Sequence, residues 1–217
     1  MNPKLNAMLA QLPEADYELL LPFLQLVSLE EGRTLYALGQ PMPTVYFPIN
    51  TLVAVAMRLR DGVTIDTCLV GAQGIMGLRG LYAPCQHHIY VAVTGMAYKM
   101  DIERLRQVMR ASFPVLEMCL RARENNLVNM SIEVACSHFH SNEQRLARWL
   151  LTRMDRHQTQ HFQTTHQAIA DSLGVRRETV THALSKLKGL EYGRGQIEVV
   201  DRRAIESACC ECYALQR

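Results

Sequence analysis

The 217-residue chain predicts an α+β protein: an antiparallel β-roll, then a long helix, then a winged helix-turn-helix. Three observations lead to this fold class. Short apolar segments separated by turn residues fill the first part of the chain, and a long segment of helical periodicity follows. The last third holds a helix, a glycine turn, a second helix and a glycine-containing hairpin, in that order. A chain of this length has room for two modest domains.

Composition indicates an ordinary globular protein, with 48% hydrophobic and 20% charged residues. No apolar run approaches the ~20 residues of a membrane span, and acidic residues interrupt the N-terminus where a secretory signal would be apolar. We therefore expect a cytoplasmic protein that does not enter a membrane. The seven cysteines form no regular framework, so we expect reduced thiols.

Two short amphipathic helices are predicted at residues 5–12 and 14–23, followed by strands up to about Met100. Glycines and prolines divide this β-rich part at the spacing of a barrel or sandwich. Asp61-Gly62, between "LVAVAMRL" and "VTIDTCLV", is a strong hairpin signal because type I′ turns need residues that tolerate positive φ.

Asp101 is a suitable N-cap for the next helix, and Pro114 stands where prolines begin helices, opening a long segment to about His138. Five apolar residues in it recur at nearly heptad spacing and could form a dimer seam: Leu116, Leu120, Leu127, Met130 and Val134. The alternative is a stripe packed within one domain. A new helix follows, with Ser141 or Asn142 as its cap, which divides the chain into a β-roll (residues 1–113), a long helix and hinge (114–140) and a winged helix-turn-helix domain (141–217).

The stretch "TTHQAIADSLGVRRETVTHALSKLKGLEYGRGQIEVVD" indicates DNA binding. Gly174 can take the positive φ that ends one helix, and the next helix has its own apolar face. Arg177, Glu178, Thr181 and His182 project from the opposite face. Arginine donates twice to guanine, glutamate accepts from cytosine, and threonine offers a hydroxyl or a methyl.

The flanks of this pair of helices suit the phosphate backbone. Thr164, Thr165 and Gln167 offer polar groups beside the free N–H groups of a helix start, and Arg194 stands between two glycines as at a wing tip. Residues 141–217 carry 12 Lys or Arg against 9 Asp or Glu. The alternative is a helical hairpin with solvated charges, or a winged helix that binds protein or an effector rather than DNA. No nucleophile elbow, P-loop or HExxH pattern suggests an enzyme.

"GVRRETVTHALSKL" is similar to the G-x-x-R-E-T-V recognition helix of the Crp/Fnr family of bacterial transcription regulators, and "TTHQAIADSLG" resembles the helix before it. The resemblance covers nearly the whole chain and implies a cyclic-nucleotide-binding-like roll, a dimer helix and a palindromic operator. RNA polymerase is a further implied partner. Together with the residue patterns, it gives this set of DNA-contacting residues: Thr165, His166, Gln167, Arg176, Arg177, Glu178, Thr179, Thr181, His182, Lys186 and Arg194.

His182 departs from the catabolite activator branch, which has a second base-reading arginine there. We therefore expect a half-site that differs from that branch's, with a G·C pair read by Arg177 and Glu178. The "DRRAIESACCECY" ending resembles family members without an assigned ligand.

No effector is identified by the sequence. Nucleotide-binding relatives use a glutamate and an arginine at the phosphate, whereas this chain has Gln86 or His87 near the arginine position and only Arg79 nearby, so we do not expect cyclic AMP binding. Iron-sulfur-sensing relatives carry a clustered N-terminal cysteine motif, whereas no cysteine precedes Cys68 here, so the resemblance implies no iron-sulfur cluster. Haem is not expected either, because His87 and His88 would point to opposite faces of a strand.

We also expect no metal site. "CCEC", residues 209–212, brings three thiols together, but soft-metal sites usually draw on a second cluster or a histidine at ligand spacing. Helical packing against the wing domain is the interpretation we prefer for these cysteines.

Overall fold

The computed structural model describes residues 1–60, 64–157, 160–193 and 195–215. Contacts divide the chain into two compact units, which are described separately below. The first contains residues 1–56 and 68–128, and the second contains residues 57–67 and 129–217. The expected hairpin residues Asp61 and Gly62 lie outside the described residues.

The first unit begins with short helices. These are the 3-10 helix Pro3–Leu5, α1 (Ala7–Ala10), α2 (Glu14–Leu20) and the 3-10 helix Leu21–Phe23. We expected a first helix around residues 5–12, and α1 lies within that range but is shorter. The buried Asn6 has extended backbone, and its side chain accepts hydrogen bonds from the N–H groups of Met8 and Leu9, so the α-helix begins only after it.

Seven strands form the roll: β1 (Gln25–Leu29), β2 (Thr34–Tyr36), β3 (Thr44–Pro48), β4 (Leu52–Arg58), β5 (Thr64–Val70), β6 (His88–Val93) and β7 (Gly95–Asp101). In the described residues they make two sheets, with strand orders β1-β7-β3 and β2-β6-β4-β5. Pairing is antiparallel in both, with Leu26 opposite Tyr98 and Ala54 opposite Tyr90. A 3-10 helix, Leu78–Leu81, lies between β5 and β6.

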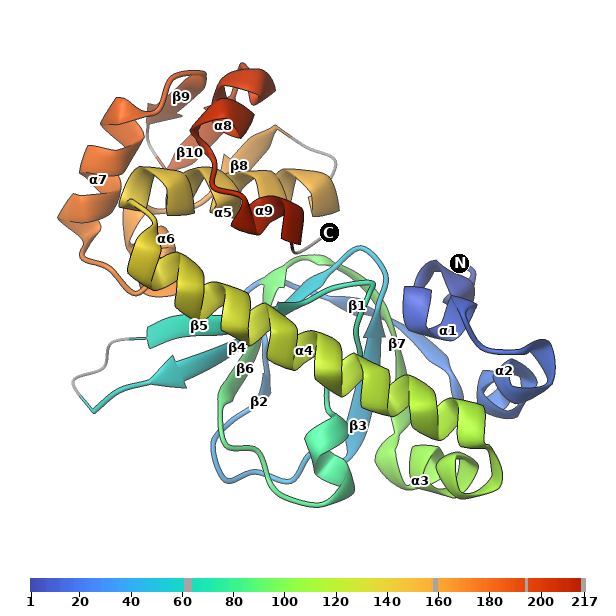
Figure 1. Ribbon diagram of the computed structural model, residues 1–217. Coiled ribbons are helices and arrows are strands. Elements are labelled where there is room, and N and C mark those ends of the chain that lie inside the picture. Colours follow the sequence, from blue (N-terminus) through green and yellow to red (C-terminus); the bar gives the residue numbers. More distant parts are fainter. Residues whose placement is uncertain (61–63, 158–159, 194, 216–217) are drawn as a thin grey trace. The chain divides into compact units, whose positions relative to one another are not determined.

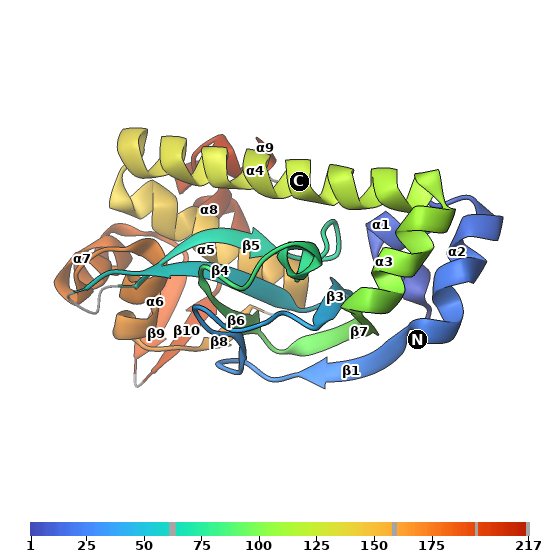
Figure 2. The same cartoon turned by 90° about the horizontal axis from the view of Figure 1, so that it is seen from below.

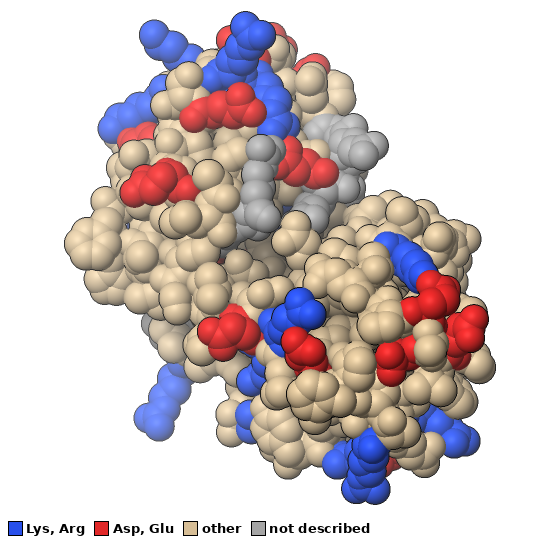
Figure 3. Space-filling view, turned by 45° about the vertical axis from the view of Figure 1, so that its right-hand side comes forward, with Lys and Arg blue, Asp and Glu red and all other residues tan. Residues whose placement is uncertain are grey.

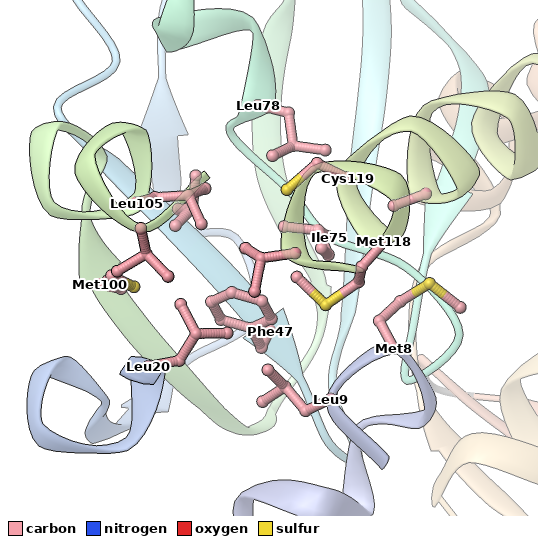
Figure 4. Close-up of a cluster of buried hydrophobic side chains, with 14 of the residues drawn as sticks. Met8, Leu9, Leu20, Phe47, Ile75, Leu78, Met100, Leu105, Met118 and Cys119 are labelled. Carbon is pink, nitrogen blue, oxygen red and sulfur yellow. The ribbon is translucent and has the colours of Figure 1, made fainter. Parts of the chain in front are cut away.

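The core of this unit gathers around Phe47 on β3, whose side chain is fully buried (Figure 4). Leu9 and Leu20 approach it from the N-terminal helices, and Met118 from the long helix. Side chains far apart in the sequence therefore share one apolar cluster, so the N-terminal helices and the beginning of the long helix are parts of the roll's own fold.

Two helices follow the roll, α3 (Ile102–Ala111) and α4 (Phe113–Phe139), and Figure 2 shows α4 as one continuous rod. Asp101 caps α3, as the sequence predicts, by accepting hydrogen bonds from two backbone N–H groups of its first turn. The 27 residues of α4 correspond to about 40 Å of helix. Helix α4 starts at Phe113, one residue before Pro114. At this start, Ser112 Oγ accepts a hydrogen bond from the N–H of Val115 at 3.2 Å.

The second unit is a helical bundle with a small sheet. Its further elements are α5 (Asn142–His157), β8 (His161–Gln163), α6 (His166–Leu173), α7 (Arg177–Lys186), β9 (Leu190–Gly193), β10 (Gln196–Val199), α8 (Arg202–Ala208) and α9 (Cys212–Leu215) (Figure 1). Ser141 is the N-cap of α5: it accepts from the N–H of Gln144, whose side chain accepts from the N–H of Ser141 in return. The sheet has the order β8-β10-β9 and is antiparallel.

An apolar core joins these helices. Leu146 and Leu150 of α5 pack with Ile169 of α6 and Leu184 of α7, and all four are buried. Trp149 belongs to the same cluster, and its indole N–H donates to Ser172 Oγ at 3.0 Å, so its one polar group is satisfied. The α+β class, with roll, long helix and winged helix-turn-helix, is confirmed. None of the described helices is both long enough and apolar enough to cross a membrane.

Replacing Leu150 by Ala should destabilise the protein by about 2–5 kcal/mol, because it leaves a cavity at a fully buried position of the second unit's core. Urea unfolding followed by Trp149 fluorescence measures this. Val200→Ala, at an exposed residue of the same unit, is the matched control and should change stability by less than about 0.5 kcal/mol. Equal effects of the two changes would contradict this packing.

Candidate nucleic-acid interface

A turn that contains Gly174 connects α6 to α7. Gly174 has φ of 64° and ψ of 41°, the left-handed conformation that glycine adopts without strain. The N–H of Val175 then donates to the carbonyl of Ala170 at 3.0 Å, which closes the end of α6. The chain reverses within three residues, and α7 begins at Arg177.

The two faces of α7 differ sharply. Val180, Ala183 and Leu184 are at most 2% exposed and pack in the core. Arg177, Glu178, Thr181, His182 and Ser185 are exposed and lie at i, i+1, i+4, i+5 and i+8, which places them on the side opposite the core. The predicted base-contacting residues thus share one outward face.

Three further predicted contacts lie at the margins of this face. Arg176 is the exposed N-cap residue of α7, and Thr179 is half-buried. Lys186 extends toward α5, where its ammonium nitrogen is 3.0 Å from a carboxylate oxygen of Glu143. That hydrogen bond lowers the pKa of the Glu143 carboxyl to about 2.

The start of α6 meets α7 through side chains. Thr165 caps α6, accepting from the N–H of Ala168 at 3.1 Å. His166 Nδ1 lies 2.8 Å from the hydroxyl oxygen of Thr181, so these two predicted DNA contacts hold each other in position. Gln167 donates to Asp171 at 2.8 Å.

The wing is the hairpin of β9 and β10, with Ile197 opposite Tyr192. It is joined to the helix pair because the N–H of Thr164 donates to the carbonyl of Gly195 at 2.9 Å. Arg194, the predicted wing-tip contact, lies outside the described residues.

A hollow of about 330 Å³ lies between these parts. Its lining includes Thr165 and His166 at the start of α6, Arg177 at the start of α7, and Gly193 and Gly195 of the wing. Backbone N–H groups at a helix start, a guanidinium and glycines without side chains suit an anionic group such as a phosphate.

Figure 3 shows Lys and Arg side chains gathered over the upper end of the second unit, with Asp and Glu among them. Such a mixed surface needs local cations rather than a broad positive field to bind a polyanion. Arg177 supplies one in the lining of the hollow, and the exposed Arg176 precedes it in the chain.

Known proteins carry the same arrangement. Residues 144–208, from the first turn of α5 to the end of α8, match the Crp-like helix-turn-helix domain family. A "CRP-like cAMP-activated global transcriptional regulator" of Mycobacterium tuberculosis is 28% identical over 171 residues, which is 75% of this chain and 76% of the relative.

Solved structures share the whole architecture. A Crp/Fnr-family regulator from Eubacterium rectale superposes with a TM-score of 0.76 at 16% identity, covering 94% of this chain and 98% of that one. FixK2 from Bradyrhizobium japonicum gives 0.69 at 19% identity, covering 86% and 98%. Residues 144–208 therefore carry a Crp-like helix-turn-helix domain, and the chain has the fold of the Crp/Fnr regulators.

The sequence analysis missed two contacts of this interface. The Lys186–Glu143 pair joins α7 to α5, and the His166–Thr181 contact joins α6 to α7. Each contact joins residues of two different helices. The sequence does not indicate which neighbouring side chain an exposed polar residue will contact.

Replacing Lys186 by Met should lower stability at neutral pH by about 0.3–1 kcal/mol, a small value because the pair is partly exposed and screened. Since the folded-state pKa of Glu143 is depressed from 4.5 to about 2, this contribution is present above pH 4.5 and is lost as pH falls toward 2. Urea unfolding between pH 7 and 3 tests it, with Lys188→Met as control. A Lys186 effect that stayed constant over this range would refute the assignment.

Proposed function

We propose that the chain is a DNA-binding transcriptional regulator of the Crp/Fnr type, which binds a two-fold symmetric operator as a homodimer with α7 of each subunit in the major groove. The observation that carries the proposal is the outward polar face of α7, opposite a fully buried apolar face. An α-helix fits the major groove, where each base pair displays a distinct pattern of donors and acceptors. Two-fold symmetry of the protein would place half-site centres about one helical turn, roughly 34 Å, apart.

Arg177 and Glu178 are the proposed base-reading residues because they stand in the first turn of α7, the part of a recognition helix that reaches base edges. Arginine can donate to O6 and N7 of guanine while glutamate accepts from N4 of the paired cytosine. Thr181 and His182, one turn further on, would face the next base pairs. Thr179 is half-buried and Lys186 is paired with Glu143, so both are secondary contacts in this proposal.

Phosphate contacts would come from the hollow beside α7. The hydroxyl of Thr165 and the imidazole of His166 line it together with the Arg177 side chain. Such contacts fix the register of the protein on the duplex, while α7 supplies the sequence preference.

Dimerisation is proposed through α4. Leu120, Leu127 and Val134 are 57–60% exposed and recur every seven residues, whereas Met118 and Ala122 on the other side of the helix are buried. Leu116 and Met130 of the predicted seam are half-buried, and the exposed Phe113 extends the row at its N-terminal end. An apolar row of this length along an exposed helix face suits pairing with its own copy.

We further propose that the roll does not bind cyclic AMP. The mycobacterial relative, by contrast, is named as cAMP-activated. Arg79 Nε donates to the carbonyl of Pro84 at 2.7 Å, and the guanidinium lies 5.6 Å from the ring centroid of Tyr82. Burial lowers the pKa of His87, which disfavours a cationic imidazole at this position. A cytoplasmic location and contact with RNA polymerase also remain predictions.

Arg177→Ala should weaken operator binding by about 1–3 kcal/mol and relax the preference at one G·C pair per half-site. Selection from random duplexes followed by titration at fixed salt measures both quantities. Arg203→Ala removes the same charge from an exposed position on α8 and should leave the selected motif unchanged. An unchanged motif for the Arg177 variant would refute the base-reading role.

Leu120→Glu should convert the dimer into a monomer, because it places a carboxylate in the proposed α4 seam. Sedimentation velocity at micromolar concentration tests this. Leu38→Glu makes the same chemical change at a 73% exposed residue between β2 and β3 and should leave the assembly intact. A Leu120 variant that sedimented as a dimer would rule out this seam.

A further inference from the structure

Three thiols and one imidazole converge at the junction between α4 and the C-terminal tail. Cys136 lies in the last turn of α4, His140 follows the end of that helix, and Cys210 and Cys212 belong to the tail after α8. One ligand atom from each of the four residues lies within 4.8 Å of all the others.

The individual separations suit a single tetrahedral ion. Cys136 Sγ is 3.6 Å from Cys210 Sγ, and Cys212 Sγ is 3.6 Å from His140 Nδ1. With zinc–sulfur bonds of about 2.3 Å and zinc–nitrogen bonds of about 2.0 Å, tetrahedral angles put ligand atoms about 3.5–3.8 Å apart. Little movement is therefore needed to bring all four atoms to bonding distance.

Burial is that of a closed site. Cys136, Cys210 and Cys212 are at most 5% exposed, and the His140 side chain is 14% exposed. Four protein ligands leave no open position for substrate or water, which is typical of structural zinc sites. A cluster with two irons would distribute its ligands over two metal positions. The four ligand atoms here lie within 4.8 Å of one another, which fits one ion better.

The second ring nitrogen of His140 also has a suitable partner. Nε2 lies 3.2 Å from a carboxylate oxygen of Glu211, between the two tail cysteines. A histidine that ligates metal through one nitrogen commonly donates its other N–H to a carboxylate, which fixes the ring and the tautomer. Nδ1 is thereby the nitrogen directed at the thiols.

Contacts that involve no thiol group already hold the two halves of the site in place. The hydroxyl of Tyr213 donates to Asp155 of α5 at 2.5 Å, and Arg202 of α8 donates to the same carboxylate at 2.8 Å. Tail helix α9 packs against α5 (Figure 1). On the other side, the N–H of His140 donates to the carbonyl of Cys136 at 3.2 Å, which continues the helical pattern and keeps the two side chains on one face.

These contacts correct the sequence interpretation of the tail. Cys209 and Cys210 are not in a helix: α8 ends at Ala208, and Cys209 has extended backbone with ψ of 154°. The sequence analysis found no second group of metal ligands to join the cysteines of the tail. Cys136 and His140, a C-x-x-x-H pair about 70 residues before the tail, are that second group. Helical spacing at i and i+4 was its only signal.

We propose that Cys136, His140, Cys210 and Cys212 bind one zinc ion, which fastens the C-terminal tail to the end of α4. The alternative is that the thiols pack as small apolar groups beside Ile132. Apolar packing does not account for an imidazole nitrogen among three sulfur atoms or for its carboxylate partner. Burial raises the pKa of the Cys136 thiol to about 12, so zinc binding would displace protons from the thiols.

Metal analysis of the full-length protein, purified under reducing conditions without chelator, tests the proposal. We expect about one zinc per chain in the wild type and in Cys209→Ser, whose thiol is adjacent to the cluster but outside it. Cys136→Ser and Cys210→Ser should each retain roughly tenfold less. Glu211→Gln should keep the ligands but weaken zinc affinity about 10–100-fold, measured by competition with a chromogenic chelator.

Two spectroscopic measurements on the wild-type protein test the same proposal even if the cysteine variants fail to fold. X-ray absorption at the zinc edge should show three sulfur neighbours at about 2.3 Å and one nitrogen at about 2.0 Å. The same protein reconstituted with Co²⁺ should show thiolate charge-transfer bands and intense visible bands of tetrahedral geometry. Wild-type protein that holds no zinc and gives no tetrahedral Co²⁺ spectrum would overturn the proposal. So would a Cys136–Cys210 disulfide in metal-free protein, or full zinc content in both cysteine variants.

Discussion

The burial of Val180, Ala183 and Leu184 against α5 and α6 determines which side chains of α7 face outward. A helix has only one orientation that buries this apolar stripe, so Arg177 and Glu178 are directed outward without making any contact of their own in the core. The turn at Gly174 then fixes the angle between the two helices. Base reading, phosphate binding and wing placement all depend on this orientation.

The end of α4 is fastened to its neighbours by polar groups rather than by apolar packing alone. Arg148 of α5 donates to both carboxylate oxygens of Glu133, at 2.6 and 2.5 Å, and Arg148 is only 5% exposed. A buried bidentate pair is costly to break from one side, because the remaining charge would lose both of these hydrogen bonds. The proposed zinc site lies on the same part of α4. These groups tie the helix that would carry the dimer seam to the helices that present α7.

Local patterns accounted for much of this structure. Short sequence patterns correctly predicted the caps at Asp101 and Ser141, the glycine turn and the apolar stripe of α7. Each pattern involves residues within one or two helical turns of one another. The first helix was predicted too long because Asn6 acts through a capping bond that composition does not show. The Lys186–Glu143 pair and the meeting of Cys136 with Cys210 could not be predicted, since they depend on tertiary placement and no residue spacing indicates them.

Methylation protection by dimethyl sulfate on a selected duplex tests the central claim most directly, because the reagent attacks guanine N7 in the major groove and adenine N3 in the minor groove. We expect protection of guanine N7 at two symmetric positions about one helical turn apart, and loss of that protection with Arg177→Ala. Protection confined to adenine N3, or no protection of guanine N7 under saturating protein, would contradict the placement of α7 in the major groove.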